Sequence, residues 1–162
     1  MKQLNIGIIG AGRIGKLHAQ SITYAVPSAR VYGITDVRST GLQELKEKFG
    51  IEKIYASVEE MLADEAIDAV LICSSTDTHA DIAIQAAKAG KHIFCEKPVD
   101  LTPEKVEAVL DAVDKAGVKL QVGFNRRFDH NFARLRELIE QEKIGKLELI
   151  KITSRDPEPP PA

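Results

Sequence analysis

The stretch Ile6–His18, IGIIGAGRIGKLH, decides the fold of this 162-residue chain. It joins a short apolar run to three glycines spaced G-x-G-x-x-G, and a helical pattern follows. In such a turn Gly10 suits the tight bend, Gly12 lets a pyrophosphate approach the backbone, and Gly15 lets the new helix pack closely on the strand. The amides and the positive dipole end of that helix would hold the phosphate charge. The stretch predicts a dinucleotide-binding turn.

Asp36 supports this interpretation, because glycine triplets also occur by chance in loops. It ends a second apolar run, about 20 residues after the glycines, where an acid accepts hydrogen bonds from the adenosine ribose. A carboxylate there repels a 2′-phosphate, so we expect NAD rather than NADP. Arg38 weakens that expectation, since a nearby arginine can accept the phosphate. Arg13 and Ile14 lie at the helix start, and Arg13 is either a pyrophosphate contact or a surface arginine.

Composition and charge limit the class of protein. Hydrophobic residues make up 44% and charged residues 28% of the chain, as in an ordinary globular domain, and the net charge is −2. That charge provides no basic field for nucleic acid or an anionic membrane. No apolar run is long enough to span a bilayer, and no signal-peptide layout opens the chain. Cys73 and Cys95 each end an apolar run and are interpreted as reduced, buried residues. We therefore expect a cytoplasmic protein.

Strands and helices alternate along the chain with short connections. An α/β fold is expected: a doubly wound parallel sheet with helices on both faces, because crossovers between parallel strands are right-handed. The expected strands are 4–9, 30–36, 53–55, 69–73, 92–95 and 119–123, and the expected helices are 13–24, 40–49, 57–62, 76–90, 102–117 and 131–141.

Four of these helices have sequence signals at their starts. Thr40 with Gln43 and Ser57 with Glu60 have the spacing of capping boxes. Thr102 precedes a proline and is expected to be an N-cap. The segment Ser74–Asp77 is expected to cap the helix that follows it.

The end of the sequence breaks the alternation. Residues 146–154 (KLELIKITS) are strand-like but lead into prolines instead of a helix. We interpret residues 1–124 as the dinucleotide-binding domain, and residues 125–162 as a connecting helix and the first strand of a second domain that is absent. In that helix Phe132, Leu135, Leu138 and Ile139 are expected to face inward. The unpaired strand is expected to join the same strand of another copy or to fold back on the edge of the domain.

Glu96-Lys97-Pro98 follows a predicted strand, at the sheet edge where ligands of such folds bind. A lysine there could take a proton from a substrate hydroxyl while hydride leaves the same carbon. A nearby positive nicotinamide ring would help lower the pKa of that lysine. From spacing alone, an ordinary solvated lysine before a proline turn is the simpler interpretation.

Several motifs together resemble the glucose–fructose oxidoreductase/inositol dehydrogenase/MocA (Gfo/Idh/MocA) family. The chain is most similar to the inositol 2-dehydrogenases within that family. The motifs are GxGRIGxxHA at 10–19, Asp36, SSTDTH at 74–79, FCEKP at 94–98 and GFNRRFD at 123–129. They cover nearly the whole sequence. The resemblance implies hydride transfer from a secondary alcohol of a cyclic polyol to NAD.

The resemblance also assigns roles to particular residues. Lys97 is implied as the catalytic general base, on a loop shaped by Glu96 and Pro98, and Arg127 is implied to face the nicotinamide or a polyol hydroxyl. The residues implied to lie along the cofactor are Ser74, Ser75, Thr76 and His79. A packing role for His79 is equally compatible with its position. No metal ligands are expected.

Members of the family carry a second domain that supplies an aspartate, a histidine and most substrate contacts. Because those residues are absent from the 162, we expect this polypeptide to bind cofactor without turnover. Two alternatives stay open at this point. One is a standalone, non-catalytic or engineered dinucleotide-binding module. The other is a dehydrogenase of a related sugar, because substrate specificity lies mainly in the second domain.

Overall fold

A computed structural model describes residues 3–153 and residue 155. Six parallel strands form one sheet in the order β3-β2-β1-β4-β5-β6. The strands are β1 Leu4–Ile9, β2 Ala29–Thr35, β3 Lys53–Ile54, β4 Ala69–Ile72, β5 His92–Cys95 and β6 Leu120–Val122. The predicted doubly wound α/β fold is confirmed. Strands β2 and β3 are added on one side of β1, and strands β4 to β6 are added on its other side. The order of the strands therefore reverses between β1 and β4, and sheets of this type bind ligands there, at the carboxyl ends of the strands.

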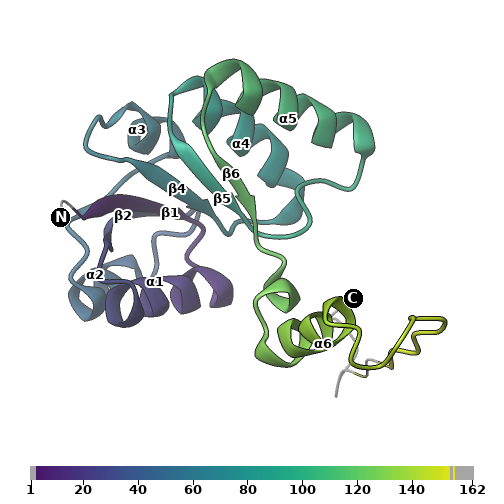
Figure 1. Cartoon of the computed structure of the whole chain (residues 1–162). Coiled ribbons are helices and arrows are strands. Elements are labelled where there is room, and N and C mark those ends of the chain that lie inside the picture. Colours follow the sequence, from purple (N-terminus) through teal and green to yellow (C-terminus); the bar gives the residue numbers. More distant parts are fainter. Residues whose placement is uncertain (1–2, 154, 156–162) are drawn as a thin grey trace. The chain divides into compact units, whose positions relative to one another are not determined.

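Helices cover both faces of this sheet (Figure 1). They are α1 Arg13–Ala25, α2 Leu42–Phe49, α3 Val58–Ala63, α4 Thr76–Lys88 and α5 Pro103–Ala116. One hydrophobic core lies under α1 and α2, and another lies under α3, α4 and α5. Neighbouring residues of a strand enter opposite cores, as Leu71 and Ile72 do. Coverage on both faces explains why the strands lack polar alternation.

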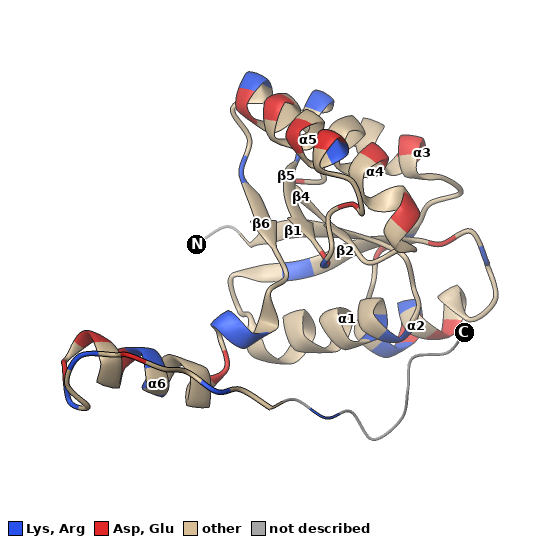
Figure 2. Cartoon of the chain, turned by 90° about the vertical axis from the view of Figure 1, so that its right-hand side faces the viewer, with Lys and Arg blue, Asp and Glu red and all other residues tan. Residues whose placement is uncertain are grey.

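Acidic and basic residues lie mainly in the helices and the connecting segments, and the strands carry few of them (Figure 2). Among the residues described, no helix is long and apolar enough to cross a membrane.

Element ends differ from the expected ones by at most two residues, and three of the four predicted caps form no side-chain cap bond. The capping box of Thr40 and Gln43 is wrong. Gly41, with φ 85°, is the N-cap of α2, and no side chain caps that helix. The left-handed backbone at Gly41 starts the helix one residue later than the box requires. Thr102 is the N-cap of α5, but its hydroxyl donates to Asp100 Oδ1 (3.1 Å) instead of capping the helix.

The remaining two predicted caps lie at the starts of α4 and α3. Ser75 is the N-cap of α4 but forms no side-chain cap bond, so the predicted cap is present in position only. At α3, Ser57 Oγ accepts from the Glu60 amide (3.2 Å) as predicted. The Glu60 carboxylate accepts from the Ala56 amide (2.8 Å), one residue before the N-cap.

The chain divides into two compact units, residues 1–123 and 124–162, each described here by itself. The second unit contains the 3-10 helix η1 Asn125–Arg127 and the helix α6 His130–Glu140. The expected inward face of α6 is present only in part: Phe132, Leu138 and Ile139 are half-buried, whereas no residue of α6 is fully buried and Leu135 is 41% exposed. Within the described part of this unit, η1 is the one other helical element and is too short to cover an apolar stripe.

The predicted strand at 146–154 is also wrong where it can be described. Residues 146–153 form no strand, because none of the described backbone pairs with them. Ser154 and the prolines at 157–161 lie outside the described residues. Pairing between copies through this segment stays a prediction.

Candidate functional site

The turn between β1 and α1 is built by its glycines. Gly10 has φ 98°, and its amide donates to Thr35 O (2.9 Å) at the end of β2. A Cβ on Gly10 would lie 2.6 Å from the backbone of Cys73, at the end of β4. A Cβ on Gly15 would overlap the carbonyl oxygen of Gly10. Both positions therefore require glycine so that α1 and the ends of two strands can approach the turn.

Gly12 has a different environment. A Cβ there would meet no described atom within 4 Å, so the backbone faces open space. Gly12 is the N-cap of α1, which has no side-chain cap bond and no acidic residue in its first turn. The first amides of α1, including those of Arg13 and Ile14, therefore have no capping partner among the described side chains. This uncapped helix start fits a bound phosphate group.

Asp36 follows β2 and lies beside the glycine turn. Its Oδ2 accepts from the Ala11 amide (2.6 Å) and its Oδ1 from the Arg38 amide (2.8 Å). The Asp36 side chain is 11% exposed, whereas that of Arg38 is 82% exposed, with Nε 4.0 Å from Asp36 Oδ1. Each carboxylate oxygen keeps a lone pair for a further donor. The acid is thus fixed in orientation and can still accept bonds from ribose hydroxyls.

A cavity of about 510 Å³ opens at the carboxyl ends of β1, β2 and β4. Of the predicted cofactor residues, its lining includes Gly10, Gly12, Asp36, Arg38, Ser74 and Ser75. Sequence reasoning missed the wall contributed by the start of α3, namely Ala56, Ser57, Val58 and Glu59, as well as Val37, Thr78 and Ile82. The capping signal at Ser57 located the start of α3, but only the sheet order places that start beside β2.

A second hollow adjoins the first and shares Gly12, Asp36 and Arg38 with it. Its lining adds Arg13 and Lys16 from α1, together with Ala11 and Thr40. Three cationic residues, Arg13, Lys16 and Arg38, therefore line the same hollow as the Asp36 carboxylate. Lys16 and Thr40 were not predicted as site residues, although Lys16 follows directly after the last glycine of the motif.

The loop after β4 is held by its own hydroxyls and by a buried histidine. Ser74 Oγ and Thr78 Oγ1 are 2.7 Å apart, and Thr78 Oγ1 donates to Ser75 O (2.7 Å). His79, 2% exposed, has its Nε2 3.0 Å from Ser74 O and its Nδ1 2.8 Å from Pro98 O. Thr76 begins α4 and lies outside the lining of the cavity. The loop is thereby tied to the turn after β5.

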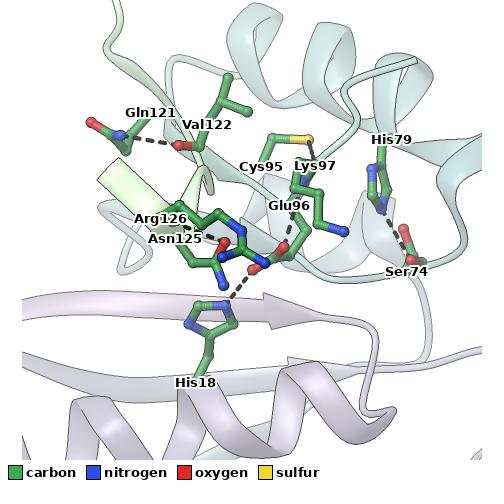
Figure 3. Close-up of polar contacts among 10 residues, drawn as sticks. All are labelled: His18, Ser74, His79, Cys95, Glu96, Lys97, Gln121, Val122, Asn125 and Arg126. Atoms are coloured by element: carbon green, nitrogen blue, oxygen red, sulfur yellow. Dashed lines mark hydrogen bonds and ion pairs between the residues drawn. The ribbon is translucent and has the colours of Figure 1, made fainter. Parts of the chain in front are cut away.

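That turn contains Glu96 and Lys97, followed by a cis peptide bond to Pro98. Glu96 Oε1 lies 2.8 Å from Nε2 of His18, which projects from α1 (Figure 3). Glu96 Oε2 accepts from the Lys97 amide (3.3 Å). The Lys97 side chain is exposed to solvent. Two histidines thus hold the turn on its two flanks, while the lysine stays accessible.

The two cysteines lie beside this turn as free thiols. Burial, with a smaller effect from the Glu96 carboxylate, raises the pKa of both Cys73 and Cys95 to about 12. Cys95 Sγ donates to Glu96 O (3.3 Å). Both thiols therefore stay protonated near neutral pH and act as small packing groups.

The structure gathers some predicted site residues and leaves others apart. The glycine turn, Asp36, Arg38 and the Ser74–Ser75 loop share one cavity. Glu96, Lys97 and His79 flank the cavity without lining it. Arg127 lies in η1, within the second unit, and its role toward a substrate stays a prediction.

A doubly wound parallel sheet, a glycine turn with an uncapped helix start and an acid after β2 define a dinucleotide-binding domain. Residues 4–124 match the model of the oxidoreductase family with an NAD-binding Rossmann fold, Gfo/Idh/MocA. The chain belongs to that family. The resemblance expected from the sequence is confirmed.

Named relatives lie within the same family. A myo-inositol 2-dehydrogenase of Thermotoga maritima is 49% identical over 98% of this chain and 47% of its own length. A scyllo-inositol 2-dehydrogenase (NAD(+)) of Bacillus subtilis is 39% identical over 99% of this chain and 47% of its own. The solved scyllo-inositol dehydrogenase of Lactobacillus casei, with bound NAD(H) and scyllo-inositol, superposes with a TM-score of 0.85. It is 36% identical and covers 89% of this chain and 43% of its own. The chain spans about half the length of these relatives.

Proposed function

We propose that this chain is the NAD-binding part of a dehydrogenase that oxidises a secondary alcohol of a cyclic polyol of the inositol type. The observation that carries the proposal is the open space at Gly12, beside an uncapped helix start and the fixed Asp36 carboxylate. The inositol dehydrogenases among the relatives favour the substrate class.

The residues around the cavity fit the parts of NAD. The first amides of α1 would hold the pyrophosphate, and Asp36 would accept bonds from the adenosine ribose. The wall formed by Val37, Val58 and Ile82 offers apolar surface to a flat base. Bound NAD supplies a hydride acceptor for the carbon that carries the alcohol.

Lys97 is the proposed general base. It follows β5 at the carboxyl edge of the sheet, its backbone is held by Glu96, and its side chain is open to a reactant. In the proposed role its amine takes the hydroxyl proton as the carbonyl forms. Since the 162 residues span about half the length of the relatives, we propose that they bind cofactor without turning over substrate by themselves.

Titration with NADH and with NADPH, followed by nicotinamide fluorescence, tests the cofactor part of the proposal. We expect tighter binding of NADH, because the Asp36 carboxylate repels a 2′-phosphate. The cations of the second hollow oppose this effect, so we expect a moderate preference, about tenfold. Asp36→Ser should reduce the ratio of the two affinities. Tighter binding of NADPH to the unaltered chain would overturn the NAD assignment.

Mixing the same chain with NAD and myo-inositol tests the rest. We expect cofactor binding without formation of NADH. Formation of NADH at a rate abolished by Lys97→Ala would show that these residues suffice for catalysis. Turnover that survives Lys97→Ala would contradict the role of Lys97.

A further inference from the structure

His79 makes an arrangement of hydrogen bonds that a neutral histidine cannot complete. Its Nδ1 lies 2.8 Å from Pro98 O and its Nε2 lies 3.0 Å from Ser74 O, and the residue is 2% exposed. Figure 3 shows the contact with Ser74. Both partners are backbone carbonyl oxygens, which only accept hydrogen bonds. A neutral imidazole carries one N–H, whereas the imidazolium carries two. Both bonds therefore form only when both ring nitrogens carry a proton.

The two carbonyls belong to the two segments that flank the proposed cofactor site. Ser74 lies in the loop after β4 and lines the cavity. Pro98 ends the turn after β5 that carries Lys97. When His79 loses one proton, the bare nitrogen of its buried ring faces a carbonyl oxygen, and neither of these two acceptors receives a hydrogen bond from the other. An unpaired acceptor on a buried ring is costly, so the joint between the two segments weakens.

The other titratable groups on these segments have partners of their own. Cys73 keeps its proton, because its pKa is raised to about 12. Cys95 keeps its proton for the same reason. Glu96 is bonded to His18 of α1, and Asp100 accepts from the amides of Leu101 and Thr102 and forms an ion pair with Lys105. The side chains of Asp77, Asp81 and Lys97 are exposed. No bond to the His79 ring from any of these groups is among the described contacts.

We propose that His79 is a proton-dependent clamp that joins the Ser74 loop to the Glu96–Pro98 turn and so keeps the cofactor site in its binding geometry. His79 is a positioning residue, since it acts through Ser74 and Pro98. The clamp has both hydrogen bonds in the imidazolium form and only one of them in the neutral form. Cofactor affinity therefore falls when the His79 ring loses one of its two protons. The link to affinity rests on the proposed function, whereas the clamp itself does not.

Nitrogen-15 NMR of the histidine side chains, on the unaltered chain without cofactor, tests the clamp directly. At low pH we expect both ring protons of His79 to be visible and protected from exchange with water. We expect one proton to disappear with rising pH, together with shifts of the amides next to Ser74 and Pro98. A ring with a single proton throughout the range in which histidines titrate, about pH 5 to 8, would overturn the proposal.

NADH titrations across the same pH range test the link to binding. We expect affinity to fall about tenfold toward the upper end, as for loss of one hydrogen bond that involves a charged group. His18 is the other histidine bonded to this turn, through Glu96, so His18→Gln is the matched control. The fall should persist in His18→Gln and vanish in His79→Gln. A fall that vanishes in His18→Gln and persists in His79→Gln would overturn the link.

The two readouts separate the possible failures. Absence of NADH binding at every pH contradicts the proposed function. The NMR result then still tests whether the two hydrogen bonds of His79 depend on its protonation. A protected, doubly protonated ring with pH-independent affinity overturns only the link to binding. If His79→Gln does not fold, the pH series of the unaltered chain and of His18→Gln still decides, because the clamp requires the fall in both.

Discussion

Gly12 and Gly15 lie three positions apart, yet an added methyl group would meet opposite surroundings. At Gly15 it would overlap Gly10 O, whereas at Gly12 it would meet nothing within 4 Å. Gly12 also has φ −68°, which alanine adopts readily. One glycine is thus required by the fold, and the other is left for a ligand.

This contrast predicts two distinct phenotypes. Gly15→Ala should lower the free energy of unfolding by about 1–3 kcal/mol, because the overlap outweighs alanine's helix propensity of about 1 kcal/mol. Gly12→Ala should change the free energy of unfolding by less than about 0.5 kcal/mol but weaken NADH binding tenfold or more. Urea denaturation and NADH titration of both variants measure these effects. Normal NADH affinity in a folded Gly12→Ala would contradict the role of Gly12.

Sequence spacing alone predicted the glycines and Asp36, because the local motif dictates both. The bond from the Ala11 amide to Asp36 was not predictable, since it depends on how closely the end of β2 approaches the turn. His79 is similar: its position after SSTDT was visible, but its two carbonyl partners come from separate loops. Contacts between segments distant in sequence require the folded sheet.

At the scale of elements, Asp64 joins the outer strand β3 to the start of β4. Its Oδ2 accepts from Lys53 Nζ (2.6 Å) and Tyr55 OH (2.8 Å), and its Oδ1 from the Ala66 amide (2.8 Å). These bonds, led by that with Lys53, lower the pKa of Asp64 from 3.8 to about 2. The carboxylate therefore stabilises the fold above about pH 4, and this contribution is lost as pH falls toward 2.

We predict that Asp64→Asn lowers the free energy of unfolding by about 1–3 kcal/mol near neutral pH, as expected for hydrogen bonds to a charged group. The difference from the unaltered chain should shrink as pH falls from about 4 to about 2. Thermal denaturation over this range measures it, with the exposed Asp114→Asn as control. A difference that does not change with pH would show that the Asp64 charge is not responsible.

Element type was predictable where periodicity and caps agree, as at Ser57 and α3. It failed where one signal stood alone. The capping box at Thr40 was overridden by the left-handed Gly41, and the strand-like run at 146–153 has no described neighbour to pair with. A strand needs hydrogen bonds from another strand, and a sequence run cannot supply them by itself.

At the scale of the whole molecule, residues 1–123 form a complete sheet with two cores, and the proposed site lies at the β1–β4 reversal. Residues 124–162 form a separate unit whose helix α6 leaves its apolar residues partly exposed. Fold class and family could therefore be predicted from motifs in the first unit. The structure of the second unit could not, because its residues bury little apolar surface among themselves.

The central claim is that NAD binds this chain across the β1–α1 turn and the end of β2. Amide NMR of the chain, recorded with and without NAD, tests it most directly. The account predicts the largest shifts at residues 10–15, 36–38, 56–59 and 73–78, with little change over α5. Shifts confined to other segments, or none at saturating NAD, would contradict it.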